Sequence, residues 1–149
     1  MNQREIKFRL WNSIDKEWDS PSIVEIFSDD GVLRPLYNDD NGGDWRNKYI
    51  ITQYTGLKDK NNKEIYEGDI VKVQRCFTRP IVKDGKLNYN FTEGGEEVGE
   101  VMYLWNGSLA VSYEHIRGDD FDTDILHVKH RVEVIGNIHQ NIELLGKRV

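Results

Sequence analysis

The sequence predicts a mainly β protein, an all-β barrel or roll with additional strands, long loops and little helix. Two observations favour this class. Several short runs of alternating apolar and polar residues are separated by tight turns, which is typical of barrels and rolls. Strong helical periodicity appears nowhere in the chain, so a βαβ arrangement is not expected. The aromatic content of 4 Trp, 7 Tyr and 5 Phe also argues against a disordered chain.

The N-terminal third begins with strands and then becomes irregular. The stretch "EIKFRLW" (5–11) has the period of a half-buried strand, and further strands are expected near 17–18 and across "SIVEIF" at 22–27. Residues 28–47 are rich in Asp, Asn and Gly, which predicts a loop. That loop includes one short strand candidate at 32–37, weakened by Pro35.

The middle of the chain predicts a hairpin followed by a tight step. "YIITQYTGL" (49–57) is a strand, "KDKNN" is the turn after it, and "KEIYEGDIVKVQ" (63–74) returns. Within the return, Gly68 and Asp69 are expected to form a turn into a strand that begins with Ile70. Barrel geometry alone accounts for this step, so it does not by itself indicate binding.

Two further hairpins are expected downstream. Residues 74–99 predict a long hairpin around "KDGK" with a mobile tip and a loop at "EGGEE". The pair Asn106-Gly107 is the clearest hairpin signal, because Asn-Gly supplies two residues with positive φ for a type I′ turn. Residues 131–138 predict a strand interrupted by Gly136, and a single helical turn is expected at 141–145.

Length and charge limit the classes of function. The 149 residues suit one domain, with an N-terminal β lobe (about 1–48) packed on a barrel (about 49–145) as a further expectation. The net charge of −6 disfavours nucleic-acid binding through overall charge. One cysteine, an N-terminus without an apolar run and the lack of a long apolar stretch predict a cytoplasmic protein that does not engage a membrane.

Three segments together resemble the YopX-like proteins of bacteriophages and prophages. They are "IKFRLW" near the start, "QYTGLKDKNNKEIYEGDIVKV" in the middle and "EVIGNIHQNIELL" near the end. The resemblance extends from about residue 4 to about residue 145. It implies an SH3-like barrel, a single YopX-like domain over 1–149, and a phage or prophage gene expressed in a bacterial host. It implies no established activity, so no catalytic residue is carried over.

Candidate metal and catalytic residues do not assemble into a specific motif. Asp120, Asp122 and Asp124 have the spacing that begins a calcium loop, but Ile125 and Arg131 stand where glycine and the bidentate glutamate belong. The remaining titratable residues add no convergent set: His127 and His130 are three apart and would point to opposite faces of a strand, and Cys76 has no base placed by a motif. We therefore expect no metal, no cofactor and no enzymatic activity, with an enzyme kept as a remote alternative.

Basic and aromatic residues gather between residues 72 and 91. Cations beside exposed rings can track a phosphate backbone while the rings stack on bases, although charges on a β edge also serve to prevent edge pairing. The sequence thus leaves nucleic-acid binding as the alternative function. The residues that would carry it are Lys72, Arg75, Phe77, Arg79, Lys83, Lys86, Tyr89 and Phe91.

The leading expectation is a non-enzymatic accessory protein that binds an unknown host or phage protein. Aromatic residues are enriched at protein interfaces, and four tryptophans exceed what a small polar domain needs. Exposed strand edges also make a homo-oligomer an expectation. The tryptophans are Trp11, Trp18, Trp45 and Trp105.

Overall fold

The structure is a computed structural model that describes residues 5–19, 24–25, 34–35, 49–104, 106–113 and 131–146. Within these ranges, the side chains of 24–25, 34–35, 76–78 and 91–93 are not described. The chain divides into two compact units, Met1–Gly56 and Leu57–Val149, and each is treated by itself.

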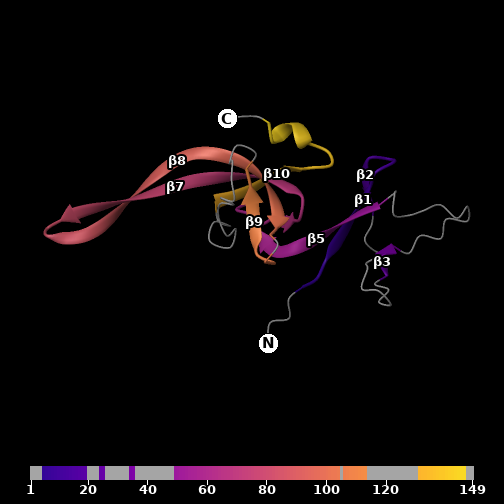
Figure 1. The fold of residues 1–149 in the computed structure, drawn as a ribbon, viewed down its shortest axis with the longest axis horizontal. Helices are drawn as coiled ribbons and strands as arrows, with labels where there is room; N and C mark the ends of the chain where they lie inside the picture. Colours follow the sequence, from indigo (N-terminus) through magenta and orange to yellow (C-terminus); the bar gives the residue numbers. More distant parts are fainter. Residues whose placement is uncertain are drawn as a thin grey trace, which may run out of the picture. The chain divides into compact units, whose positions relative to one another are not determined.

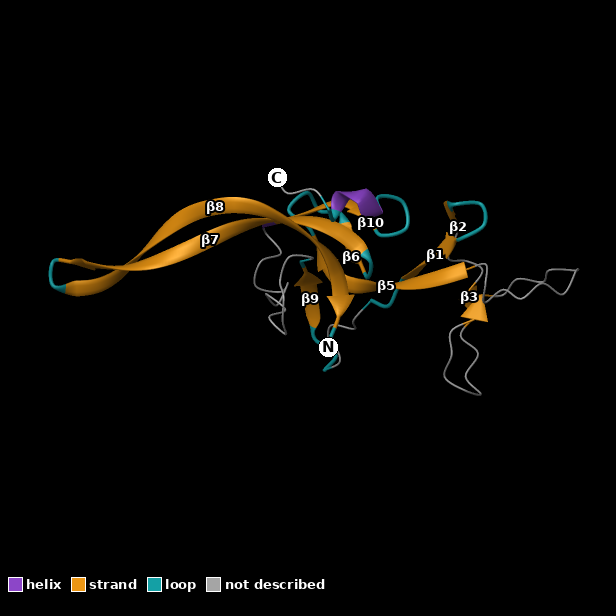
Figure 2. Cartoon of the chain, turned by 45° about the horizontal axis from the view of Figure 1, so that its top comes forward, coloured by secondary structure: helices purple, strands orange, loops and turns teal. Residues whose placement is uncertain are grey.

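The described part of the chain is mainly β, as the sequence predicts (Figure 1, Figure 2). Its helical content is one short 3-10 helix, and no described helix has the length and apolar character needed to cross a membrane. The strands are β1 (Phe8–Asn12), β2 (Glu17–Asp19), β3 (Val24–Glu25), β4 (Arg34–Pro35), β5 (Tyr49–Lys58), β6 (Glu64–Tyr66), β7 (Asp69–Lys83), β8 (Lys86–Tyr103), β9 (Leu109–Ser112) and β10 (Val132–Asn137), and the 3-10 helix η4 spans Ile142–Leu144.

The first unit is organised by β1, which pairs antiparallel with β2 on one side and with β5 on the other. Leu10, Trp11 and Asn12 are consecutive and all buried, with Leu10 0% and Trp11 3% exposed, so both faces of β1 are covered at this end of the strand. Trp11 meets Trp18 edge to face at 5.2 Å between ring centroids, a favoured aromatic geometry. The guanidinium of Arg9 lies 4.2 Å from the Trp18 ring centroid. These two tryptophans therefore hold the unit together and do not form a free aromatic surface.

The second unit contains a four-stranded antiparallel sheet in the order β10-β7-β8-β9. The sheet curls into a half-barrel, and β-branched residues on its inner side form the core. The strand β6 contributes Ile65 to the same core. The buried members are Ile65, Val71, Val73, Val101, Leu109, Val111, Tyr113, Val132 and Val134.

The turn between β6 and β7 lies one residue earlier than the sequence predicts. Glu67 and Gly68 form it, Gly68 has φ of +75°, and Asp69 is already the first residue of β7. The Asp69 side chain is 1% exposed and accepts a hydrogen bond from the Tyr66 N–H at 2.8 Å. Gly68 also donates its N–H to the carbonyl of Val101 and accepts from the N–H of Ile138. The step is thus a structural junction between strands.

The hairpin turns predicted at "KDGK" and at Asn106-Gly107 are both present. The type I′ turn forms at "KDGK", whereas the sequence predicts it at Asn106-Gly107. Asp84 and Gly85 have φ of 53° and 72°, the pattern of a type I′ turn between β7 and β8. Gly107 has a φ of 78° in the turn between β8 and β9. The Leu104 carbonyl accepts from the Gly107 N–H, and the Leu104 N–H donates to Ser108, so β8 and β9 are joined by a longer turn. The type I′ prediction for Asn106-Gly107 is therefore wrong.

The segment 74–99 is more regular than the sequence predicts. The long hairpin is confirmed, but the predicted loop at "EGGEE" belongs to β8, where the pairing with β7 shifts between Gln74 and Cys76. A shift in register lets one strand carry an extra residue while the ladder continues. Strand β10 contains a similar shift between Val134 and Gly136, at the glycine where the sequence predicts an interruption.

Candidate binding surface on the β7–β8 arm

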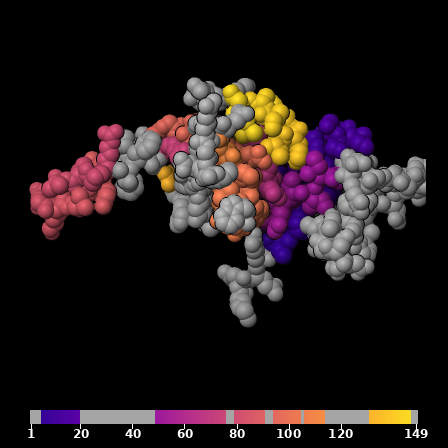
Figure 3. Space-filling model, viewed as in Figure 1, coloured from indigo at the N-terminus to yellow at the C-terminus, as the bar shows by residue number. Residues whose placement is uncertain are grey.

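Strands β7 and β8 are much longer than the strands beside them. Strand β10 pairs with Asp69–Val73 and β9 pairs with Glu100–Tyr103, so the far parts of β7 and β8 pair only with each other among the described strands. Figures 1 and 2 show this two-stranded extension leaving the sheet, and its end is a separate finger of atoms in the space-filling view of Figure 3. We call residues 79–90 the arm.

The register gives the arm two chemically different faces. Directly opposite residues of an antiparallel pair share a face, and successive pairs alternate between faces. The pairs Pro80↔Tyr89 and Val82↔Leu87 form the apolar face. The alternate pairs form the basic face, which comprises Arg79, Asn90, Ile81, Asn88, Lys83 and Lys86.

The apolar face is exposed to solvent. Val82 is 76% exposed, Leu87 62% and Tyr89 59%, and Pro80 is also exposed. Isolated exposed apolar side chains are common, but four on one face of a narrow two-stranded ribbon form a contiguous patch. A two-stranded ribbon has no second layer of its own to cover such a patch.

Two of the predicted cations, Lys72 and Arg75, lie in the part of β7 that leads to the arm, which we call the base of the arm, and carboxylates neutralise them there. Lys72 Nζ lies 3.3 Å from Glu96 and 4.0 Å from Glu133. Arg75 donates its Nε–H to Glu97 at 2.6 Å, forms an ion pair with the same carboxylate, and lies 5.1 Å from the Tyr113 ring centroid. Each cation therefore has a carboxylate beside it, which offsets the positive charge that a phosphate would meet there.

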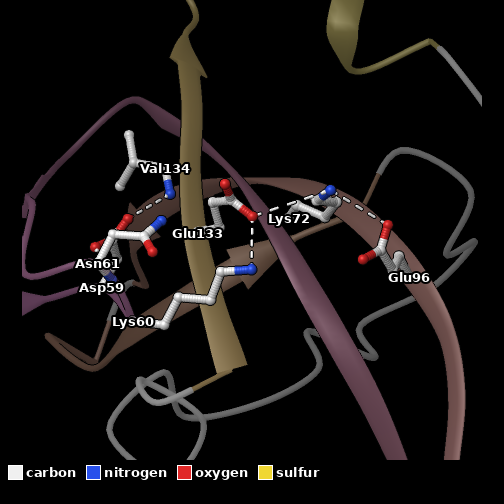
Figure 4. Close-up of polar contacts among 7 residues, drawn as sticks. All are labelled: Asp59, Lys60, Asn61, Lys72, Glu96, Glu133 and Val134. Carbon is white, nitrogen blue, oxygen red and sulfur yellow. Dashed lines mark hydrogen bonds and ion pairs between the residues drawn. The ribbon is translucent and has the colours of Figure 1, made fainter.

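A chain of charges joins the base of the arm to β10 (Figure 4). Glu133 accepts from Lys60 at 2.7 Å and lies within ion-pair distance of Lys72. The hydrogen bond between Lys60 and Glu133 raises the pKa of Lys60 and lowers the pKa of Glu133, so both groups are held in their charged forms. Exposed pairs of this kind contribute little stability.

A buried carboxylate lies beside this chain of charges. Asp59 is 6% exposed and accepts from the N–H groups of Asn61 at 2.8 Å, Lys63 at 2.9 Å and Val134 at 3.0 Å. Burial, the largest single influence, raises the pKa of the carboxyl, but these donors outweigh it and lower the pKa below its usual value. Asp59 therefore ties the β5–β6 turn to β10 and has a structural role.

The structure thus places the side chains of six of the eight predicted site residues. Arg79, Lys83 and Lys86 share the basic face, whereas Tyr89 lies on the apolar face and cannot interleave with them. Lys72 and Arg75 are paired at the base. The side chains of Phe77 and Phe91 lie outside those described.

Sequence reasoning missed the apolar face, although its signal was present. Val82 and Leu87 are equidistant from the Asp84-Gly85 turn and are therefore opposite each other in a two-residue hairpin. The same counting pairs Pro80 with Tyr89. Considering only charges and aromatic rings left these aliphatic positions out.

The other sequence candidates add no second site among the described residues. Trp45, Trp105, Asp120, Asp122, Asp124, His127 and His130 lie outside the described ranges. Within those ranges, no group of three His, Cys, Asp or Glu residues could hold a metal ion.

Comparison with known proteins identifies the family. The sequence model described as YopX protein matches residues 7–146, nearly the whole chain. The structure is similar to the crystal structure of protein EF1440 from Enterococcus faecalis, with 27% identity and a TM-score of 0.53 over 96% of this chain and 99% of that chain. A search of curated proteins finds no match. Because the family model covers far more than half of the sequence, this chain belongs to the YopX protein family.

Proposed function

We propose that this protein acts without catalysis, by binding a protein partner of the host or the phage through the apolar face of the arm. The observation that carries the proposal is the exposure of Val82, Leu87 and Tyr89 on one face of the arm. Apolar side chains grouped on a protruding element are typical of protein interfaces, where aromatic residues are also enriched. Covering them would remove apolar surface from water, which favours association.

The composition of the arm supports binding over catalysis. Its twelve residues, "RPIVKDGKLNYN", contain no Ser, Cys or His, and the one carboxylate, Asp84, is in the turn. Nucleophilic catalysis commonly uses Ser, Cys or Thr with a general base placed beside it, and the arm has none of these three residue types. The arm instead offers apolar, amide and cationic side chains, which suit recognition.

The biological setting is part of the same proposal. We place the protein in the cytoplasm of a bacterial host as a phage or prophage accessory protein, and the supporting observation is its similarity to YopX proteins. The SH3-like form of the barrel is likewise proposed for the second unit, supported by the curl of its four-stranded sheet.

Nucleic-acid binding by the arm is less well supported than protein binding. Lys72 and Arg75 are engaged by carboxylates, which leaves three cations on the basic face. Tyr89 lies on the opposite face, so a strand tracking the cations would not stack on its ring. The net charge of −6 adds long-range repulsion.

The proposal is tested by comparing two surface variants in affinity capture from a bacterial lysate. Leu87→Asp places a charge in the apolar face, whereas Ile142→Asp places the same charge at an exposed apolar residue of η4 in the same unit. We expect one discrete protein to be captured by the natural protein and by Ile142→Asp, and lost with Leu87→Asp. Equal capture by both variants would contradict a role for the arm.

A further inference from the structure

We infer that the arm takes its partner as an added β-strand on the outer edge of β8, and that the partner segment is extended, with acidic and apolar residues alternating. This inference rests on the proposed function and specifies how the same surface is used. It is carried by three features of the arm: the direction of its backbone groups, the position of Pro80, and the charges on its basic face.

The type I′ turn determines which backbone groups of the arm face outward. In a two-residue turn, Lys83 and Lys86 flank the turn and form a hydrogen-bonded pair. Hydrogen-bonded and non-hydrogen-bonded pairs then alternate along an antiparallel ladder. The pairs Val82↔Leu87 and Pro80↔Tyr89 are therefore non-hydrogen-bonded, and their N–H and C=O groups point away from the partner strand.

The outer edges of the arm have no strand paired to them among the described residues. The pairing of β9 ends at Glu100 and the pairing of β10 ends at Val73, well before the arm begins. An unpaired edge with regular N–H and C=O groups is a template for strand addition. Both edges of the arm are unpaired in this way among the described strands.

Pro80 makes the two edges unequal. Proline has no N–H, and at a non-hydrogen-bonded site the missing donor is one that would have faced outward. Of the two outward-facing sites on the β7 edge of the arm, Pro80 and Val82, only Val82 therefore keeps an N–H donor. On the β8 edge, Leu87 and Tyr89 both keep outward N–H and C=O groups, so β8 is the edge that can accept a continuous ladder.

Charge specifies the sign of the partner's polar residues. Lys83 and Lys86 lie directly opposite each other, an unfavourable like-charge pair, and Arg79 is on the same face. The arm has three cations and one anion, a net charge of +2, whereas the whole chain has −6, so the other 137 residues carry −8. An acidic side chain beside Lys86 would relieve the repulsion at the tip.

The two faces together define the partner's pattern. A strand added to β8 projects its side chains alternately onto the basic face and the apolar face. Acidic residues suit the first, beside Lys86, and apolar residues suit the second, beside Leu87 and Tyr89. Strand addition derives affinity from main-chain hydrogen bonds and specificity from alternate side chains, which matches this arrangement.

The test uses a labelled synthetic peptide in which glutamate alternates with valine, added to the full-length protein and followed by fluorescence anisotropy. Tyr89→Val removes the ring and keeps the outward N–H, whereas Tyr89→Pro removes the ring and the N–H. Because position 89 is a non-hydrogen-bonded site, the hairpin ladder tolerates proline there, as it does at Pro80. We expect Tyr89→Pro to bind about tenfold more weakly than Tyr89→Val.

Three results with the peptides would overturn the inference. They are no binding of the peptide, equal affinity of the two Tyr89 variants, or equal binding of a control peptide with lysine in place of glutamate. Salt-sensitive binding of labelled oligonucleotides in place of the peptide, or a dimer that forms through the arm and excludes the peptide, would also overturn it. Circular dichroism checks that both variants keep the fold. Loss of lysate capture in Leu87→Asp still tests the proposed function separately, because that experiment does not depend on how the partner is held.

Discussion

Replacing Asp59 with alanine tests whether this buried carboxylate joins the β5–β6 turn to β10. The N–H groups of Asn61 and Lys63 belong to an exposed turn and can be rehydrated after the change. The N–H of Val134 lies in a buried strand, where an unpaired donor costs about 1–3 kcal/mol. The loss of the charge-assisted hydrogen bonds to the carboxylate adds to the cost of this unpaired donor. We therefore expect Asp59→Ala to lower the free energy of unfolding by about 3 kcal/mol.

Asparagine at the same position separates hydrogen bonding from volume. Its oxygen can still accept from the turn, but its NH₂ group would face the Val134 N–H, so we expect Asp59→Asn to lose most of the same stability. For a chain of this length, about 3 kcal/mol corresponds to roughly 6–12 °C in melting temperature. The exposed Glu143→Ala is the matched control and should change stability by about 0.5 kcal/mol or less.

The pH dependence gives a second check on Asp59. Because its pKa in the folded protein is lowered, its contribution is fully present above the unfolded pKa of about 3.9 and is lost as the pH falls through the folded value. The stability gap between the natural protein and Asp59→Ala should therefore be constant near neutrality and narrow in acid. Thermal unfolding followed by circular dichroism over that range measures it. A gap below about 1 kcal/mol at neutral pH would refute the reasoning, since it would mean that the Val134 donor finds another partner.

Three further predictions follow from packing and charge. Gly99→Ala should destabilise the protein by about 1–3 kcal/mol, because a Cβ there would lie 2.5 Å from the Ser112 carbonyl oxygen, whereas Gly95→Ala, with open space around it, should be nearly neutral by thermal melting. Glu100→Gln should stabilise the protein near neutral pH and have no effect below about pH 4. Burial, and then the charge of Glu67, raises the pKa of Glu100 in the folded state, and a carboxylate with a raised pKa weakens the fold as the pH rises. Equal melting temperatures of the natural protein and Glu100→Gln at neutral pH as well as in acid would argue against it. Labelled DNA and RNA oligonucleotides should not bind at about 0.15 M salt, as measured by anisotropy, and micromolar binding abolished by exchanging Arg79 and Lys83 for Glu would contradict this.

Local patterns in the sequence predicted most of the strands. Alternation around Leu10, the buried run after Gly68 and the Asp84-Gly85 turn each depend on residues close together in the chain, so a single sequence is sufficient to recognise them. The predicted turn type at Asn106-Gly107 was wrong because the turn is closed by a hydrogen bond between Leu104 and Ser108, just beyond the ends of β8 and β9, which local propensity does not reveal.

Contacts between distant residues were less predictable. Nothing near Lys72 or Arg75 in the sequence indicates that Glu96, Glu97 and Glu133 neutralise them, because those contacts depend on the register of β7 with β8 and β10. Likewise, the sequence led us to interpret Trp11 and Trp18 as interface residues, because their pairing across the β1–β2 hairpin is not visible in the sequence. The candidate site changed accordingly, from a basic and aromatic strip to an arm with separate apolar and basic faces.

Amide hydrogen exchange at the arm tests most directly whether a partner binds as an added strand on the β8 edge. In the free protein, the outward N–H groups of Leu87 and Tyr89 should exchange quickly, while the N–H of Asn88, paired with Ile81 across the hairpin, should be protected. Adding a saturating amount of the captured partner, or of the alternating peptide, should slow exchange at Leu87 and Tyr89 and leave the outward Val82 N–H on the β7 edge unchanged. Unchanged exchange at Leu87 and Tyr89 on binding, or protection appearing only at Val82, would contradict the account.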